Sequence, residues 1–269
     1  MSNQIKYKCY NCGRSGKISK EIFFRKQTPF CRGCISTNII AVDEYNSIWR
    51  IKDMKVELVS ITKPMVSGLD TAEDLIVYCA RVSNPNNQLN VDTGAKLLKY
   101  CIKHGHWSIF EQVDMTVEIK TSRAIAAQIL RHKTFSFQEF SQRYAEIQEF
   151  EDIELRMQGK TNRQVGDEVV NPELEHEGLA SNVIDDHVKY SKALYNSLIE
   201  AGVARECARM VLPLNVQTTL YMKGNVRSWI HYLQLRTKED TQKEHRLVAE
   251  QIKYIFQKEF PIIADAIEL

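Results

Sequence analysis

Residues 113–132 read VDMTVEIKTSRAIAAQILRH, and their periodicity changes partway along the stretch. From Val113 to Lys120 apolar and polar residues alternate, which is the pattern of a half-buried strand. From Arg123 to His132 the apolar residues have the spacing of a packed helix. We therefore expect a strand over 113–120 and a helix over 123–132.

The sequence on both sides also mixes strand and helix patterns. Residues 55–61 alternate like a strand, and Asp70 has the form of a helix N-cap, with an acid three residues later, for a helix that runs to Arg81. Further helices are expected over about 93–103, ending at Gly105, and over 181–201, 204–211, 223–236 and 239–258, with a polar surface excursion over 146–178. The mixture predicts an α+β fold. The sequence contains no G-x-G-x-x-G or P-loop motif, so a Rossmann or Walker nucleotide site is unsupported.

The charge distribution divides the chain near residue 40. Residues 1–40 carry eight basic side chains against the single acid Glu21, a charge of +7, whereas the remainder carries 28 basic and 33 acidic side chains, a charge of −5. We expect an N-terminal module over 1–40, a linker over 41–54 and a larger domain over 55–269. The sequence has no apolar run long enough to cross a membrane and no signal-peptide core, so we expect a cytoplasmic protein without a membrane partner.

Four of the seven cysteines form two C-x-x-C pairs in the N-terminal module. They are Cys9 and Cys12 and, after eighteen residues, Cys31 and Cys34. This spacing is typical of a structural four-thiolate zinc site in a zinc ribbon, with a short strand expected over 21–26. A redox motif or unrelated cysteines are alternatives, although a redox motif needs no second copy. Zinc would supply stability that so small a segment cannot gain by burial.

The same module is rich in basic residues and aromatic residues. The aromatic ones include Tyr7, Tyr10, Phe23, Phe24 and Phe30. This composition is compatible with nucleic-acid binding. The alternative, which we favour, is that the aromatic side chains form the small core of the module and that the charges keep it soluble.

A dense polar cluster, RHKTFSFQEFSQRY, occupies residues 131–144. Its two arginines, its lysine and its hydroxyl groups are of the kind that clamps phosphates. Charge-rich segments are also common on solvated surfaces. The flanking apolar residues argue against full exposure of this one.

Arg131-His132-Lys133, followed after seven residues by Ser141, resembles the R-H-R-x7-S motif of flavin-dependent thymidylate synthases. Further blocks of resemblance follow the family's order, at 79–83 (CARVS), 104–111 (HGHWSIFE), 208–213 (ARMVLP) and 225–228 (NVRS), continuing to Leu235 and Arg236. The resemblance covers nearly all of the chain from about residue 55. Several separate blocks in order are far more specific than any single motif.

The resemblance implies an α+β enzyme that converts dUMP to dTMP, with FAD as cofactor, methylenetetrahydrofolate as carbon donor and NADPH as reductant. It also implies a homotetramer whose FAD sites lie where subunits meet. The positions matched for FAD are Ser83, His106, Ser108, Glu111, Arg131, His132, Lys133, Glu139, Asn225, Arg227 and His231. Those matched for dUMP are Gln128, Arg131, Glu139, Ser141, Arg143, Arg209 and Arg236.

Two of the matched positions carry a physical expectation of their own. Arg236 resembles the family arginine that contacts the uracil, and it is the expected catalytic residue because a cation there would stabilise negative charge that develops on the ring. Gln128 and Arg131 are three residues apart, so we expect them on one face of the predicted helix.

The sequence departs from the family pattern at several positions. Lys133 keeps the charge of the usual arginine but loses its fork. Asp240 stands where some members have a flavin-contacting histidine, so that role is not carried over, and His231 stands where some have asparagine. Cys79, Cys101 and Cys207 are expected to be packed core residues rather than catalytic thiols.

A second function is open to this chain, that of a nucleic-acid-binding zinc-ribbon protein with an inactive synthase-like body. The presence of Arg131, Ser141, Arg143, Arg209 and Arg236 argues against it, because a decayed site has no reason to retain them.

Overall fold

The computed structural model describes residues 4–9, 15–19, 39–41, 54–146 and 149–269. The chain divides into two compact units, Met1–Lys52 and Asp53–Leu269. The division falls within residues 41–54, where the charge pattern predicts a linker.

The first unit contains a three-stranded antiparallel sheet in the order β2-β1-β3. Its strands are β1 (Gln4–Cys9), β2 (Ser15–Ser19) and β3 (Ile39–Ala41). Cys9 is the last residue of β1 and pairs with Ile39. The other three predicted zinc ligands, Cys12, Cys31 and Cys34, and the strand expected over 21–26 lie outside the described residues.

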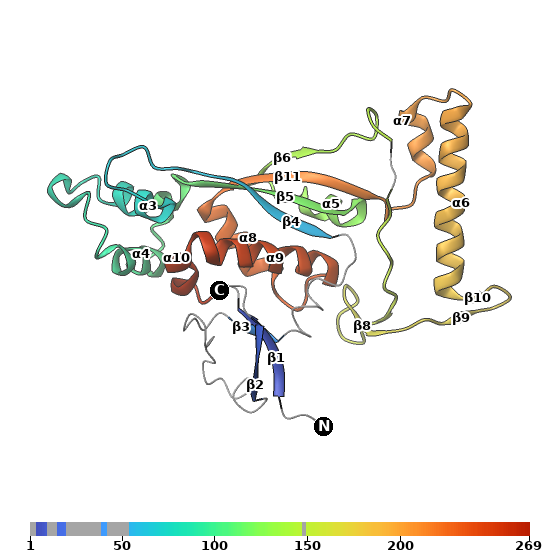
Figure 1. Cartoon of the computed structure of the whole chain (residues 1–269), viewed down its shortest axis with the longest axis horizontal. Helices are drawn as coiled ribbons and strands as arrows, with labels where there is room; N and C mark the ends of the chain where they lie inside the picture. Colours follow the sequence, from blue (N-terminus) through green and yellow to red (C-terminus); the bar gives the residue numbers. More distant parts are fainter. Residues whose placement is uncertain (1–3, 10–14, 20–38, 42–53, 147–148) are drawn as a thin grey trace. The chain divides into compact units, whose positions relative to one another are not determined.

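The second unit is built on a four-stranded sheet in the order β4-β5-β11-β6, with every pairing antiparallel (Figure 1). The strands are β4 (Lys55–Ile61), β5 (Asp114–Ser122), β6 (Ser136–Glu139) and β11 (Gln217–Asn225). The two central strands, β5 and β11, pair from Asp114↔Asn225 to Ser122↔Gln217 although they are far apart in the sequence. The strands expected over 55–61 and 113–120 are thereby confirmed, with a shift of one or two residues at the ends of β5.

One face of this sheet forms the core. Met115, Val117 and Ile119 of β5 are fully buried, and they alternate with partly exposed residues as the sequence predicts. Helices α8 (Val226–Arg236) and α9 (Lys243–Glu259) lie along this face (Figure 1). The fully buried Trp229 of α8 fixes the packing, because its Nε1 donates a hydrogen bond to the Met115 carbonyl oxygen at 3.1 Å.

Three further helices pack together beyond one end of the sheet: α3 (Ala72–Ala80), α4 (Gly94–Lys103) and α10 (Pro261–Ala266) (Figure 1). The short 3-10 turns η1 (Pro85–Asn87) and η2 (Trp107–Glu111) lie in the same part of the chain. The buried carboxylate of Glu73 accepts the backbone N–H groups of Ile262 at 3.3 Å and Ile263 at 2.8 Å, and so ties α3 to the first turn of α10.

The N-cap of α3 is Thr71 rather than the expected Asp70. The Thr71 hydroxyl accepts from the Asp74 backbone N–H, and the Asp74 carboxylate accepts from the Thr71 N–H, which completes a capping box. The helix therefore begins one residue later than expected.

Helix α5 (Arg123–Ile129) is shorter than the helix expected over 123–132. Its C-cap is Leu130, so Arg131 and His132 lie beyond its end in a turn that leads to β6. The expectation that Gln128 and Arg131 share a helical face is therefore wrong.

The polar segment 146–178 has more regular structure than expected. Strand β7 (Arg156–Gln158) pairs with β8 (Gly166–Val169), and β9 (Glu173–Leu174) pairs with β10 (Gly178–Leu179). It is followed by α6 (Ala180–Glu200), α7 (Arg205–Ala208) and the 3-10 turn η3 (Arg209–Val211). Among the residues that the structure describes, no helix combines the length and apolarity that crossing a membrane requires.

Candidate functional site

The motif that begins at Arg131 is joined to the last turn of α8 by one hydrogen bond. Arg236 Nε donates to His132 Nε2 at 3.0 Å. Burial and the neighbouring Arg236 charge lower the pKa of His132 to about 4. His132 is therefore a neutral imidazole near pH 7, and it accepts from a guanidinium 104 residues further along the chain.

Aromatic packing holds His132 in place. Its ring lies 4.9 Å from the ring of the buried Tyr232, and the neighbouring Phe135 lies 4.6 Å from Trp229, in both cases edge to face. Phe135 also lies against Gly224 of β11, where a Cβ atom would come within 2.4 Å of the ring. Glycine at 224 therefore leaves room for the aromatic ring that anchors the motif.

Several of the predicted FAD residues surround one pocket of about 500 Å³. His106, Ser108 and Arg227 line it, together with Trp107 and the buried Cys101. Arg227 also forms an ion pair with Glu111. His231 lies close by, since its ring is 5.2 Å from that of Trp107.

The remaining residues predicted for FAD lie apart from this lining. Asn225 is the N-cap of α8, where its Oδ1 accepts from the Ser228 N–H at 2.9 Å. Ser83 is exposed in the turn after α3 and is not among the residues that line the pocket. Arg131 and Lys133 are exposed on either side of the half-buried His132.

Two of the predicted dUMP arginines, Arg143 and Arg209, share a partner that the sequence did not single out. Glu206, in α7, forms an ion pair with Arg143 at 3.2 Å, and its backbone carbonyl accepts from Arg209 Nε at 3.4 Å. Ser141 is next to this cluster, because its Oγ accepts from the Arg143 backbone N–H at 3.4 Å. Only the folded chain reveals Glu206 as the shared partner, since it is a lone acid in a helical pattern.

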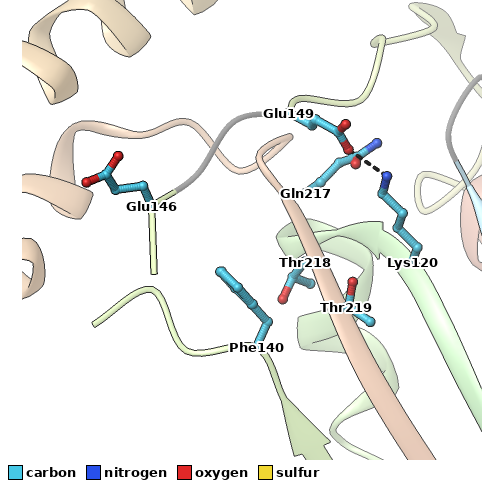
Figure 2. Close-up of a pocket in the computed structure, with 7 residues that line it drawn as sticks. All are labelled: Lys120, Phe140, Glu146, Glu149, Gln217, Thr218 and Thr219. Carbon is cyan, nitrogen blue, oxygen red and sulfur yellow. Dashed lines mark hydrogen bonds and ion pairs between the residues drawn. The ribbon is translucent and has the colours of Figure 1, made fainter. Parts of the chain in front are cut away.

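Glu139, which the resemblance places near both ligands, is fixed by two contacts. It accepts from the Thr218 hydroxyl at 3.0 Å and lies 3.3 Å from the Arg123 guanidinium. Thr218 also lines a pocket of about 260 Å³ whose other lining side chains include Lys120, Glu149 and Gln217 (Figure 2). No pattern in the sequence predicts this pocket.

Gln128 takes part in a hydrogen-bond network that includes Gln242 and His245. Of the three remaining cysteines, only Cys101 is buried, which confirms the expectation of a core residue there. The expectation is wrong for Cys207, which is exposed, and Cys79 is half-buried. Within the described residues no group of three or more histidine, cysteine or acidic side chains is arranged to hold a metal ion.

The chain is similar to proteins of one enzyme family. Residues 64–262 match the family described as thymidylate synthase complementing protein. A probable flavin-dependent thymidylate synthase from Paramecium bursaria Chlorella virus 1 is 52% identical, over 80% of this chain and 99% of its own length. A flavin-dependent thymidylate synthase from Synechocystis is 49% identical, over 80% of this chain and all of its own length.

A solved structure shows the same fold. It is a UMP/dUMP methylase from Streptomyces cacaoi bound with 5-Br dUMP, which superposes with a TM-score of 0.65 at 26% identity, over 81% of this chain and 95% of that one.

The fold and the matched residues define a methyl-transferring enzyme of mixed α and β structure. The chain belongs to the thymidylate synthase complementing protein family, and its activity is that of a flavin-dependent thymidylate synthase.

Proposed function

We propose that this chain makes dTMP by reductive methylation of dUMP, with FAD as cofactor, methylenetetrahydrofolate as carbon donor and NADPH as reductant. The observation that carries the proposal is the hydrogen bond from Arg236 to His132. It joins two segments that the family resemblance assigns, on sequence alone, to a single site.

The chain's own residues would bind and orient the nucleotide. Arg131, Ser141, Arg143 and Arg209 supply donors suited to its phosphate. The ion pair that Arg143 makes with Glu206 is more than half exposed on both sides, so a phosphate dianion could replace it at little cost. Gln128 and Glu139 would bind the same ligand, and Arg236 would stabilise negative charge on the uracil as catalytic residue.

The donor set fits a flavin cofactor. The pocket lined by His106, Ser108 and Arg227 offers a cation and neutral donors of the kind that bind a pyrophosphate. Bound FAD would supply the redox chemistry, and the protein would supply placement and charge. The other residues proposed for FAD are Ser83, Glu111, Arg131, His132, Lys133, Glu139, Asn225 and His231.

We also propose a homotetramer in which FAD sites are shared between subunits. Large exposed apolar side chains that follow two of the proposed dUMP-binding arginines, Arg143 and Arg209, in the sequence support it. Tyr144 is 83% exposed, Met210 79% and Leu214 72% in a single chain. Apolar surface gathered around a polar site is typical of a surface that another chain covers.

For the N-terminal module we propose a structural zinc site at Cys9, Cys12, Cys31 and Cys34. Its support is the spacing of the two C-x-x-C pairs. Nucleic acid is a candidate ligand of this module besides the metal.

Tritium release from 5-tritiated dUMP tests the enzymatic proposal. The full-length protein should release tritium with FAD, NADPH and methylenetetrahydrofolate present, and release should fall sharply when FAD is stripped. Protein that is folded and loaded with FAD but releases no tritium would contradict the proposal.

A further inference from the structure

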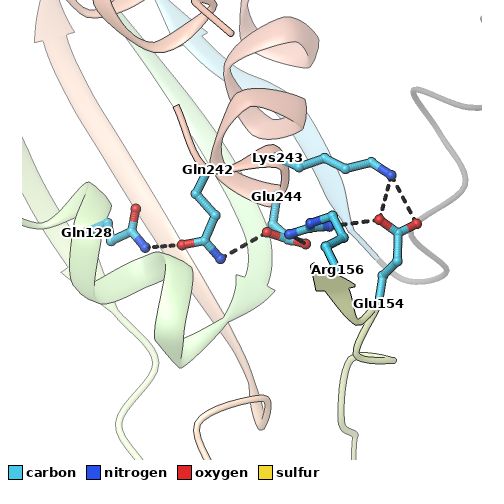
Figure 3. Close-up of polar contacts among 6 residues, drawn as sticks. All are labelled: Gln128, Glu154, Arg156, Gln242, Lys243 and Glu244. Atoms are coloured by element: carbon cyan, nitrogen blue, oxygen red, sulfur yellow. Dashed lines mark hydrogen bonds and ion pairs between the residues drawn. The ribbon is translucent and has the colours of Figure 1, made fainter. Parts of the chain in front are cut away.

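A series of side-chain hydrogen bonds starts in the excursion over 146–178 and reaches Gln128 (Figure 3). From Gln128 it continues into the core. Arg156 of β7 forms ion pairs with Glu244 at 2.6 Å and with Glu154 at 2.7 Å, and Lys243 also binds Glu154. The side chains of Arg156 and Glu244 are 13% and 17% exposed. Water therefore competes little for the Glu244 carboxylate, so the ion pair with Arg156 holds the carboxylate in place.

The carboxylate fixes the direction of the next two hydrogen bonds. An ionised carboxylate can only accept, so Gln242 must turn its amide nitrogen toward Glu244, at 2.9 Å. The amide oxygen of Gln242 then faces Gln128, whose Nε2 donates to it at 2.6 Å. A flip of either amide would place two acceptors or two donors against each other.

The same direction continues into the core. Gln128 Oε1 faces Nδ1 of the fully buried His245 at 3.4 Å, so that nitrogen must carry the proton. His245 Nε2 is then an acceptor for the Tyr232 hydroxyl at 3.1 Å. Of the two hydrogens on Gln128 Nε2, one is donated to Gln242, and the other is left for a different acceptor.

We propose that Glu244 is a positioning residue that acts through Gln242 to hold the Gln128 amide with its remaining N–H turned toward an acceptor oxygen of bound dUMP. The inference rests on the proposed function, because it requires that Gln128 contacts the nucleotide. The inference also assigns a role to the 146–178 excursion. Its Arg156 holds the Glu244 carboxylate, which sets the direction of every hydrogen bond in the series.

Glu244→Gln tests the proposal. A neutral amide can donate as well as accept, so residue 244 would no longer force the Gln242 amide nitrogen to face it. Binding of dUMP is measured by calorimetry on the full-length, FAD-loaded protein. We expect Glu244→Gln to raise the Kd for dUMP about five- to tenfold, the value of one neutral hydrogen bond, with unchanged FAD content. Gln128→Ala should weaken binding at least as much, and the double variant no more than Gln128→Ala alone.

Glu154→Gln is the matched control. It also removes a carboxylate from Arg156, but it leaves the Glu244–Gln242–Gln128 chain intact, so its Kd should equal that of the wild type. Gln242→Leu interrupts the chain at its middle without touching the Arg156–Glu244 ion pair. It should reproduce the effect of Glu244→Gln and provides the test if that variant does not fold.

Three results would overturn the inference: wild-type Kd in Glu244→Gln, equal weakening in Glu154→Gln, or full additivity of Glu244→Gln with Gln128→Ala. If the wild-type protein itself fails to bind dUMP, the proposed function fails as well, so the two failures are distinguishable.

Discussion

Arg236 is held by a neutral imidazole rather than by a carboxylate. Its positive charge is thus not offset by its protein partner, and it stays available to a substrate anion. Arg236 differs in this respect from Arg143, whose guanidinium is paired with the Glu206 carboxylate.

Arg236→Ala should lower kcat/KM for dUMP by about tenfold to a hundredfold or more, because a charge-assisted contact in a site is worth about 1.5–3 kcal/mol. FAD content, measured by flavin absorbance, should change little. Arg236→Lys is the control that keeps the charge and loses the fork. Turnover of Arg236→Ala close to that of the wild type would reject the assigned role.

His245 provides a prediction for acid stability. Burial, with Arg236 nearby, lowers its pKa to about 3, against a usual value near 6.5. The unfolded chain therefore binds a proton between these values that the folded chain does not, so stability is complete above about pH 6.5 and falls as the pH falls toward 3. Between pH 6.5 and 5 the loss from this group should be about 2 kcal/mol.

Urea unfolding of the wild type and of His245→Gln at pH 7 and pH 5 measures that loss. Glutamine does not titrate, so the decrease in unfolding free energy from pH 7 to pH 5 should be smaller in the variant. Equal decreases would show that His245 takes up its proton without unfolding.

At the scale of elements, β11 connects the core to the site. It pairs with β5 on one side and with β6, the strand of the motif, on the other. Its Gly224 admits the Phe135 ring.

Gly224→Ala should therefore displace Phe135 and, with it, the turn that contains His132. Overpacking of this kind costs about 1–3 kcal/mol, so thermal unfolding should begin several degrees lower. FAD affinity should fall as well. Lys223→Ala, on the exposed face of the same strand, is the control and should leave both unchanged. A stable Gly224→Ala variant with normal FAD affinity would contradict this account.

The sequence predicts the helices and strands that have a clear local pattern. It does not predict the bounds of elements that tertiary contacts determine. Strand β4 and helices α4 and α6 are found within a residue or so of their expected bounds. The sequence pattern does not predict strand β11 and places residues 223–225 in a helix, because the alternation from Thr218 to Met222 runs directly into the helix pattern of α8. The short helix α10 was also missed.

The site shows the same division. The family resemblance supplied the identities of Arg236, His132 and the nucleotide arginines. It could not supply Glu206 or His245, because their importance lies in which side chains they meet, and those partners are distant in the sequence or belong to another element. Arg131 was placed on a helix that ends before it, since nothing local marks the end at Ile129.

At the scale of the whole molecule, the chain has a small N-terminal unit and a larger unit that contains the whole of the family match. The viral relative aligns over 99% of its own length while covering 80% of this chain, and the family match begins at residue 64. The family's catalytic unit is therefore accounted for without the N-terminal segment.

A protein that begins at Asp53 should accordingly fold and bind FAD and dUMP with affinities near those of the full chain. Metal analysis of the full-length protein, purified without chelator, should find one zinc per chain, and the shortened protein should contain none. Zinc-free full-length protein would contradict the first expectation. A shortened protein that is soluble but does not bind flavin would contradict the second.

The pairing of β5 with β11 also has a consequence for synthesis on the ribosome. Strand β6, which carries part of the nucleotide motif, also pairs with β11. Neither β5 nor β6 can complete its pairing until β11 has been translated, about a hundred residues after β5. A nascent chain that stops short of Gln217 should leave residues 131–144 open to protease, and one that extends through Phe260 should protect them. We therefore expect the nucleotide site to be among the last parts of the protein to fold during translation, after the segment that forms the N-terminal unit has left the exit tunnel.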